Sequence, residues 1–194
     1  MEELSTKDKE LIRDSWESLG KNKVPHGVVM FSRLFELDPA LLNLFHYGTN
    51  CDSTQDRLAS PEFLEHVTKV MLVIDAAVSH LDDLHSLEDF LLNLGKKHQA
   101  VGVRTQSFAV GPTSYRTTLP KQFHERMSRE HFLLLFFFFL CVLQAVGESL
   151  LYMLQCSLGP AYTAPLRQAW LNMYSIVVAM MSRGYAENGE DKAD

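Results

Sequence analysis

Apolar residues recur along most of the chain at the spacing of an α-helix. Near the N-terminus, Ile12, Trp16 and Leu19 lie four and three residues apart, which places them on one side of a helix. Similar stripes run through residues 25–35, 39–45, 63–81, 87–101 and 164–181. No stretch shows a convincing alternation of apolar and polar residues, and no strand–helix alternation is visible. The pattern predicts an all-α fold.

Capping residues mark where several of these helices begin. Ser5 and Ser60 each stand directly before an apolar stripe, where a hydroxyl can accept a hydrogen bond from a free backbone N–H. Asp38 precedes Pro39 in the same way, and Ser86 is followed by acidic residues suited to a first turn. The polar segment 46–56, rich in Gly, Asn, Ser and Thr, is predicted to be a loop.

One segment departs from this regular pattern. Residues 132–143 form an uninterrupted apolar run, "FLLLFFFFLCVL". A membrane-spanning helix needs roughly 20 apolar residues, so the run is too short and no membrane span is expected. A buried core helix or strand remains an alternative at this point.

Length and charge narrow the class of protein. With 194 residues, 46% of them hydrophobic, the chain can form one domain with a substantial core. A net charge of −6 argues against a general nucleic-acid binder, which needs a basic surface. The N-terminus is polar and charged, unlike a signal peptide, and we therefore expect the protein to be cytosolic. The three cysteines lack metal-type spacing and are expected to be free thiols. Residues 187–194, "ENGEDKAD", are expected to be a disordered tail.

Two histidines stand on apolar helix faces. His66 shares a face with Val70 and Ile74, and His98 shares one with Leu91 and Leu94. Each alone is more typical of a hydrogen-bonded histidine at the edge of a core. Together, two helices could hold two imidazoles on opposite sides of a haem. No GxSxG, HExxH, P-loop or GxGxxG motif accompanies them.

Five long segments resemble the neuroglobins, a vertebrate branch of the globin family, in a fish-like version. They are residues 26–47, 60–78, 86–103, 146–163 and 169–184. The resemblance covers residues 1–109 and about 145–186. It implies a single globin domain over 1–194, a three-over-three helical sandwich around haem b.

The resemblance also implies a set of site residues. His98 falls at the position of the proximal iron ligand and His66 at that of the distal ligand, which gives a six-coordinate, bis-histidyl iron. The other implied haem-pocket residues are Phe31, Phe45, Tyr47, Lys69, Val70, Val103 and Phe108.

By the same resemblance, dioxygen, carbon monoxide or nitric oxide must displace His66 to bind. Family-level roles include oxygen supply or sensing, nitric oxide chemistry and electron transfer in nerve cells. The expected protein is a cytosolic monomer, with mitochondria as an alternative location and cytochrome c and G-protein α subunits as partners. Nitrite reduction or nitric oxide dioxygenation at the same iron is an enzymatic alternative.

The segment Val110–Gln144 departs from the family pattern. It separates Ala109 from Ala145, which the resemblance joins within one pocket-lining helix. Its first residue is Val, whose codons begin with GT. Its Phe/Leu run is typical of a pyrimidine-rich tract and is followed by Gln, whose codon can be CAG. A segment with GT at its start and a pyrimidine-rich tract before AG at its end suggests a retained intron read in frame. Pro112 should break the helix soon after Ala109, with a restart near Ala145. The globin core is expected to be complete without the insert. A haem-free helical interaction protein is the alternative if the insert disrupts the pocket.

Overall fold

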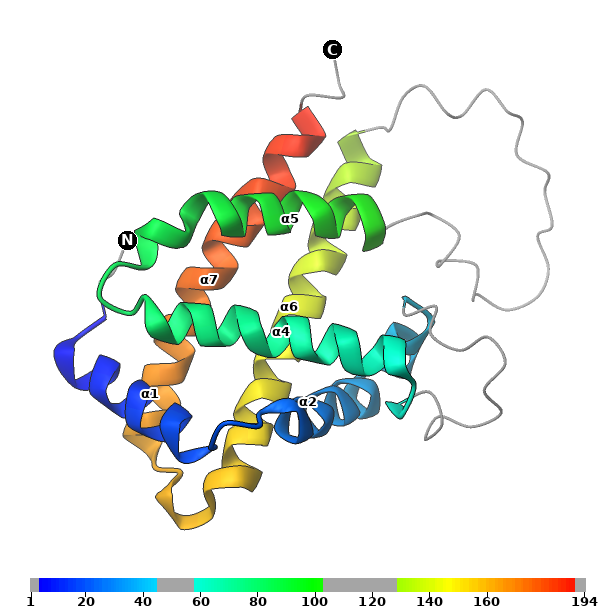
Figure 1. The fold of residues 1–194 in the computed structure, drawn as a ribbon. Coiled ribbons are helices and arrows are strands. Elements are labelled where there is room, and N and C mark those ends of the chain that lie inside the picture. Colours follow the sequence, from blue (N-terminus) through cyan, green and yellow to red (C-terminus); the bar gives the residue numbers. More distant parts are fainter. Residues whose placement is uncertain (1–3, 45–57, 103–128, 191–194) are drawn as a thin grey trace.

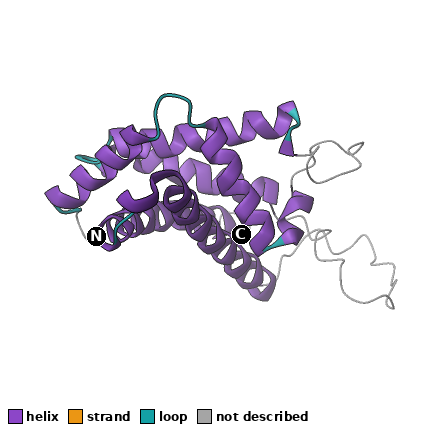
Figure 2. Cartoon of the chain, turned by 90° about the horizontal axis from the view of Figure 1, so that it is seen from below, coloured by secondary structure: helices purple, strands orange, loops and turns teal. Residues whose placement is uncertain are grey.

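The computed structural model describes residues 4–44, 58–102 and 129–190, and within these ranges every regular element is a helix (Figures 1 and 2). The elements are α1 (Thr6–Ser18), α2 (Val24–Leu37), η1 (Pro39–Leu44), α4 (Pro61–Ser79), η2 (Leu84–Leu87), α5 (Glu88–Gly102), α6 (Arg129–Leu158), η5 (Gly159–Ala161) and α7 (Ala164–Glu190). The prediction of an all-α fold is confirmed.

The helices pack in two crossed layers. In Figure 1, α4 and α5 run in opposite directions across α6 and α7. Contacts between layers join α5 to α7, α2 to α4 and α1 to α7, while α6 contacts α2 and α7 in its own layer. The helices α1, α4 and α5 therefore lie over α2, α6 and α7, the expected three-over-three arrangement.

Several helix starts follow local capping chemistry. The Ser5 hydroxyl accepts a hydrogen bond from the Asp8 N–H at 3.1 Å, and the Ser60 hydroxyl accepts one from the Phe63 N–H at 3.3 Å. These hydrogen bonds satisfy backbone donors that have no partner within the helix. The predicted caps of α1 and α4 are thus confirmed.

The start of α5 at Glu88 lies close to the prediction, and a capped turn precedes it. The Asp83 carboxylate caps this turn, because the Ser86 N–H donates to Asp83 Oδ1 at 3.3 Å. A 3-10 turn, η2, follows Asp83 and leads directly into α5 at Glu88. The predicted short helix after Asp38 is also a 3-10 helix, η1.

Two tryptophans tie α1 to the rest of the core. The rings of Trp16 and Trp170 lie 5.6 Å apart between centroids, and both residues are almost completely buried. Trp170 donates from Nε1 to Ser15 Oγ at 3.0 Å, and Trp16 donates to Asp75 Oδ1 at 2.7 Å. Each indole therefore buries its ring and still has a hydrogen-bond acceptor.

The helices α5 and α7 touch backbone to backbone. A Cβ added at Gly95 would lie 2.1 Å from the Met181 carbonyl oxygen, and one added at Gly184 would lie 2.0 Å from the Leu92 carbonyl oxygen. No side chain larger than a hydrogen fits at either position. The two glycines set the distance between α7 and the helix that carries His98.

The pocket-lining helix was predicted to break after Ala109 and to restart near Ala145, and the predicted restart is wrong. Helix α6 begins at Arg129 and runs without interruption to Leu158, so residues 129–144 of the expected insert are helical and continuous with Ala145. An uninterrupted apolar run has no helical period that could identify it as a helix. The sequence from Arg129 to Leu158 does, however, contain no proline that would stop a helix. Residues 103–128, including Pro112, lie outside the described ranges.

The expected insert contributes to the core of this chain, and the prediction that the core is complete without it stays untested. Leu143 is only 7% exposed and belongs to a second core cluster with Leu91 of α5 and Met180, Met181 and Tyr185 of α7. The larger cluster includes buried residues of α1, α2, α4, α6 and α7. The C-terminal end of the insert is therefore part of the packed protein.

One described stretch, Leu140–Ala161, is long and apolar enough to cross a membrane by length and composition. Its residues Leu150, Met153 and Leu154 are buried in the protein's own core, which accounts for the apolar composition. At the other end of the chain, α7 extends to Glu190 and so includes residues 187–190 of the expected tail.

Candidate functional site

His66 and His98 are brought to the same end of the molecule by the antiparallel course of α4 and α5. His66 lies near the start of α4 and His98 near the end of α5. The two are close enough for a charge on His98 to lower the pKa of His66. Helix periodicity placed each histidine on an apolar face, and the fold pairs them.

The His98 ring is oriented by its own helix. Its Nδ1 atom lies 2.8 Å from the backbone carbonyl oxygen of Leu94. A carbonyl oxygen can only accept, so Nδ1 must carry a proton, and in the neutral form of the ring the lone pair is then on Nε2. This is the tautomer that a metal-binding histidine needs, and such a hydrogen bond also makes the ligand more basic.

His66 is held neutral by its surroundings. Desolvation by burial is the main cause that lowers its pKa, followed by the charges of His98 and Lys69. The ring of Phe31 packs edge-on against the imidazole, with centroids 5.5 Å apart and an interplanar angle of 78°. A neutral imidazole has a lone pair available for a metal, whereas a protonated one does not.

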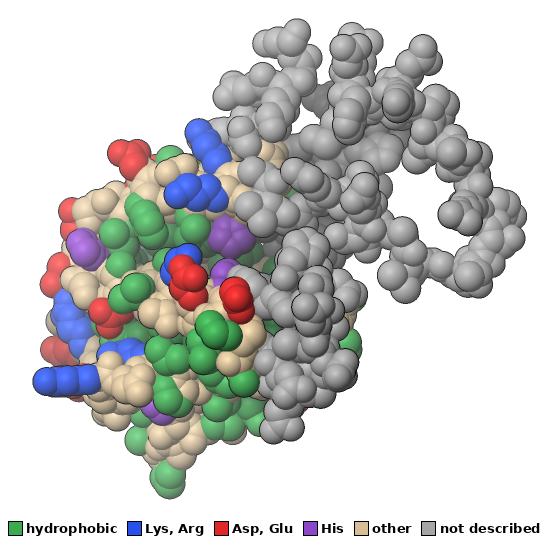
Figure 3. Space-filling view, turned by 45° about the vertical axis from the view of Figure 1, so that its right-hand side comes forward, with side chains coloured by type: hydrophobic (Ala, Val, Ile, Leu, Met, Phe, Trp, Pro, Cys, Tyr) green, Lys and Arg blue, Asp and Glu red, His purple; other side chains and the backbone are tan. Residues whose placement is uncertain are grey.

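Apolar side chains lie beside the half-buried His66 and on the α5 face that carries the exposed His98. Val70 and Ile74 of α4 are half-buried and pack against the main core, and Leu94 of α5 packs against the second cluster. Figure 3 shows histidine side chains on a face where hydrophobic side chains gather beside them. The surroundings suit a flat apolar cofactor better than a hydrated ion.

The metal-binding side chains of the described residues also favour a haem site. Among the described residues, no group of three or more His, Cys, Asp or Glu side chains could hold a metal ion. Two imidazoles are too few for a structural zinc site, which usually has four protein ligands. They suit an iron whose four other ligands are the nitrogens of a porphyrin.

The other predicted site residues divide into three described and four not described. Phe31 is buried against His66, Val70 is half-buried on the same face of α4, and Lys69 is exposed with an ion pair to Glu65 at 2.7 Å. The remaining four lie outside the described residues: Phe45, Tyr47, Val103 and Phe108.

Some features of the site were not predicted from the sequence. The Leu94 carbonyl, Gly95 and Leu143 all shape the surroundings of His98 or its helix. Gly95 did carry a signal, because a glycine in a helix interior costs roughly 1 kcal/mol and usually has a packing reason. Nothing in the local sequence identified the Leu94 carbonyl or Leu143.

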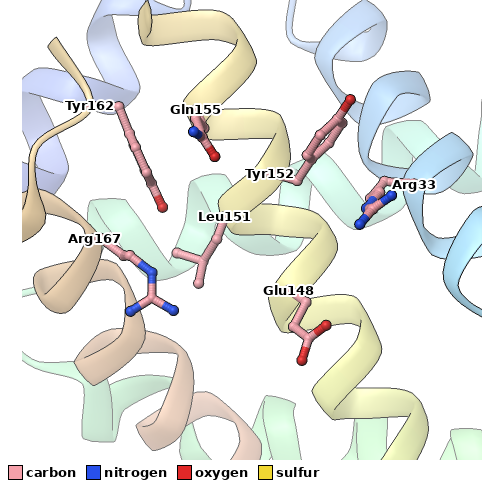
Figure 4. Close-up of a pocket in the computed structure, with 7 residues that line it drawn as sticks. All are labelled: Arg33, Glu148, Leu151, Tyr152, Gln155, Tyr162 and Arg167. Carbon is pink, nitrogen blue, oxygen red and sulfur yellow. The ribbon is translucent and has the colours of Figure 1, made fainter. Parts of the chain in front are cut away.

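A separate hollow lies between α2, α6 and the start of α7 (Figure 4). It is lined by Arg33, Glu148, Leu151, Tyr152, Gln155, Tyr162 and Arg167. The Arg33 guanidinium lies over the Tyr152 ring, 5.0 Å from its centroid, and pairs with Glu36 at 3.0 Å. The lining contains no histidine, and the hollow is not part of the site around His66 and His98.

Comparison with known proteins agrees with the fold. The family model described as Globin matches residues 28–132. Over 194 residues that cover all of both chains, the protein is 71% identical to a neuroglobin of Tetraodon nigroviridis, 72% to one of Chaenocephalus aceratus and 66% to one of Danio rerio.

A solved structure shares the architecture at low sequence identity. It is a hexacoordinated heme protein from an anhydrobiotic tardigrade, with a TM-score of 0.67 and 20% identity, covering 94% of this chain and 96% of the other. That likeness supports the fold, and the fish relatives support the family. The chain therefore belongs to the globin family, whose members are haem proteins that bind diatomic gases, and within it to the neuroglobins.

Proposed function

We propose that His98 and His66 are the two axial ligands of haem b in this chain, and that dioxygen, nitric oxide and carbon monoxide bind reversibly in competition with His66. The single observation that carries the proposal is the pairing of the two imidazoles from antiparallel helices, with His98 Nδ1 held by the Leu94 carbonyl. Haem supplies an iron with four ring nitrogens and two axial positions at which a histidine or a gas molecule binds.

The two histidines have different roles. His98 is the fixed ligand, because the hydrogen bond from Nδ1 to Leu94 sets both the tautomer and the direction of Nε2. His66 is the exchangeable ligand. It stays neutral at physiological pH, and its contact with Phe31 is an edge-on ring contact rather than a hydrogen bond.

Competition by His66 sets the gas affinity. The apparent affinity for a gas is reduced in proportion to the fraction of protein in which His66 has left its position. A slow and weakened response to gas suits sensing, scavenging or electron transfer better than bulk oxygen carriage.

The other predicted pocket residues keep their proposed places around the haem. Phe31 and Val70 supply apolar contact on the His66 side, supported by their burial next to that histidine. Lys69, although paired with Glu65, lies near enough to His66 to affect its pKa and is proposed to face a haem propionate. Phe45, Tyr47, Val103 and Phe108 are proposed from the family resemblance alone.

Location, assembly and protein partners are proposed on the same resemblance. We propose a cytosolic monomer that exchanges electrons with cytochrome c and binds G-protein α subunits. Analytical ultracentrifugation of the haem-loaded chain checks the monomer, and titration with each purified partner checks the interactions.

The decisive experiment is the absorption spectrum of the purified, haem-reconstituted chain. We expect a low-spin six-coordinate spectrum that becomes five-coordinate in His66→Ala and is lost or strongly altered in His98→Ala. The matched control is His80→Ala, because His80 also lies 2.8 Å from a carbonyl four residues earlier, that of Ala76, but stands at the opposite end of α4. Failure to bind haem, or equal spectra in all three variants, would contradict the proposal.

A further inference from the structure

We propose that the hollow between α2, α6 and the start of α7 binds a small peptide-like zwitterion that carries two carboxylates and one ammonium group. This site is separate from the two histidines and has no part in the proposed function. The hollow has a volume of about 370 Å³. Sites for small organic ligands enclose roughly 300–1,000 Å³, so a molecule of dipeptide size has room here.

One face of α6 forms the floor of the hollow. Glu148, Leu151 and Gln155 follow one another at spacings of three and four residues, which places them on one side of the helix. Figure 4 shows them on α6 with Arg167 to one side and Arg33 to the other. Leu151 is buried, whereas Glu148 and Gln155 are exposed. The floor therefore offers an apolar centre between a carboxylate and an amide.

The Arg33 side chain is held in place on the α2 side of the hollow. Its guanidinium lies over the Tyr152 ring, 5.0 Å from the centroid, and forms an ion pair with Glu36 of its own helix at 3.0 Å. An ion pair of this kind at the surface contributes little to stability. Because a guanidinium has five N–H donors, Arg33 can bind a ligand carboxylate and stay in contact with the Tyr152 ring.

Arg167 supplies a second cation from the opposite side. It lies in the first turn of α7, where its backbone N–H donates to the Thr163 carbonyl oxygen at 2.9 Å. A positive side chain at the start of a helix opposes the helix dipole. The stability of α7 therefore gives no reason for an arginine at this position.

Tyr162 provides a hydrogen-bond donor beside Arg167. Burial raises the pKa of its phenol, and the nearby charge of Arg167 acts in the opposite direction. The phenol is therefore protonated at physiological pH and can donate. The turn η5 positions Tyr162, whose N–H donates to the Gly159 carbonyl oxygen at 3.0 Å. Arg167 and Tyr162 can together donate to one carboxylate of a ligand.

The charges that line the hollow determine the class of ligand. Among the described residues, Glu148 forms no ion pair with Arg33 or Arg167, although all three line the hollow. Two guanidiniums and a separate carboxylate complement two carboxylates and an ammonium group, whereas a simple anion would be repelled by Glu148. A γ-glutamyl dipeptide carries these three groups, and its central amide can form a hydrogen bond with Gln155.

Calorimetric titration of the full-length chain with γ-L-glutamylglycine tests the proposal. The matched ligand is N-glutarylglycine, which has the same skeleton without the ammonium group. We expect saturable binding of the dipeptide, and binding of N-glutarylglycine that is roughly tenfold weaker or more because the charged hydrogen bond to Glu148 is lost. No saturable binding of the dipeptide at concentrations up to about 10 mM, or equal binding of the two ligands, would overturn the proposal.

Two variants that each remove one charge locate the bound dipeptide. Arg167→Gln and Glu148→Gln should each weaken its binding roughly tenfold or more, and Glu148→Gln should also abolish the preference over N-glutarylglycine. The controls Lys7→Gln and Glu10→Gln remove the same charges at exposed positions of α1 and should bind as the parent chain does. Circular dichroism checks that each variant is folded.

Two results would place the dipeptide elsewhere and so contradict the proposal. The first is unchanged affinity in the folded Arg167→Gln and Glu148→Gln variants. The second is a change in the absorption spectrum of the haem-loaded chain when the dipeptide is added, because this would mean that the dipeptide binds the iron. Neither result would bear on the proposed haem ligands, which the spectra of the histidine variants test.

Discussion

The Tyr174 hydroxyl on α7 donates a hydrogen bond of 2.6 Å to the backbone carbonyl of Leu143 on α6. Burial raises the pKa of Tyr174 above its usual range, so the phenol remains a donor at any physiological pH. This hydrogen bond joins the expected insert to a helix of the globin core, and it therefore contributes to the stability of the insert-bearing chain.

Replacing Tyr174 by phenylalanine should weaken the fold. Loss of one buried hydrogen bond typically costs about 0.5–1.5 kcal/mol of unfolding free energy. Urea denaturation followed by circular dichroism measures the change. Tyr152→Phe, at a position 40% exposed on α6, is the control and should cost less. A Tyr174→Phe variant as stable as the parent would show that the hydrogen bond adds nothing to stability.

Alanine at Gly95 or Gly184 should destabilise the protein although alanine favours helices. In an open helix, glycine to alanine stabilises by up to about 1 kcal/mol. Here the new methyl group would meet the Met181 or Leu92 carbonyl oxygen, and overpacking typically costs about 1–3 kcal/mol. Thermal unfolding of the apo form gives the sign directly. Asn93→Ala, at an exposed position of α5, should be neutral or slightly stabilising.

The ion pair between Glu88 and Arg183 should make the attachment of α5 dependent on pH. The hydrogen bond from Arg183, followed by one from His85, lowers the pKa of Glu88 in the folded protein. A lowered folded-state pKa means that the carboxylate stabilises the fold above its ordinary pKa and that this contribution is lost as pH falls through the lowered value.

A double-mutant cycle measures that contribution. We expect the coupling between Glu88→Gln and Arg183→Gln, from urea unfolding, to be present at pH 7 and to vanish under acid conditions below the lowered pKa of Glu88. High salt should reduce the coupling at pH 7, because both side chains are partly exposed. A coupling that is unchanged from pH 7 to acid conditions would contradict the assignment.

The origin of the insert stays a prediction that transcripts can test. If Val110–Gln144 is a retained intron, transcripts that join the codons of Ala109 and Ala145 should be the dominant product. The shorter chain would then place Phe108 in the helical position that Leu143 takes here. Genomic DNA that lacks GT and AG at the two ends of the segment would refute the retained intron.

Local chemistry made much of the fold predictable. Ser5 and Ser60 cap their helices as expected because a cap depends on residues only three apart. The start of α5 was predicted closely, but the 3-10 turn before it, capped by Asp83, was not predicted. Element types followed from periodicity, while the precise ends required the tertiary structure.

The candidate site was predictable only in part, for physical reasons. Periodicity identified His66 and His98 as residues of apolar faces, but their pairing depends on how α4 and α5 pack, and the family resemblance supplied it. The continuation of α6 through the apolar run was missed because a run without polar residues has no period. Its helical state follows from packing, as the burial of Leu143 shows.

The glycine contacts of α4 and α5 differ in what they touch. Gly27 of α2 faces the Val67 and Met71 side chains of α4, whereas Gly95 of α5 faces the Met181 backbone carbonyl of α7. Movement of α5 along α7 would force one main chain into another, while movement of α4 on α2 would be opposed by packed side chains. Of the two helices that carry the proposed haem ligands, α5 is therefore the one held by backbone contact, and α4 is the one held at Gly27 by side chains.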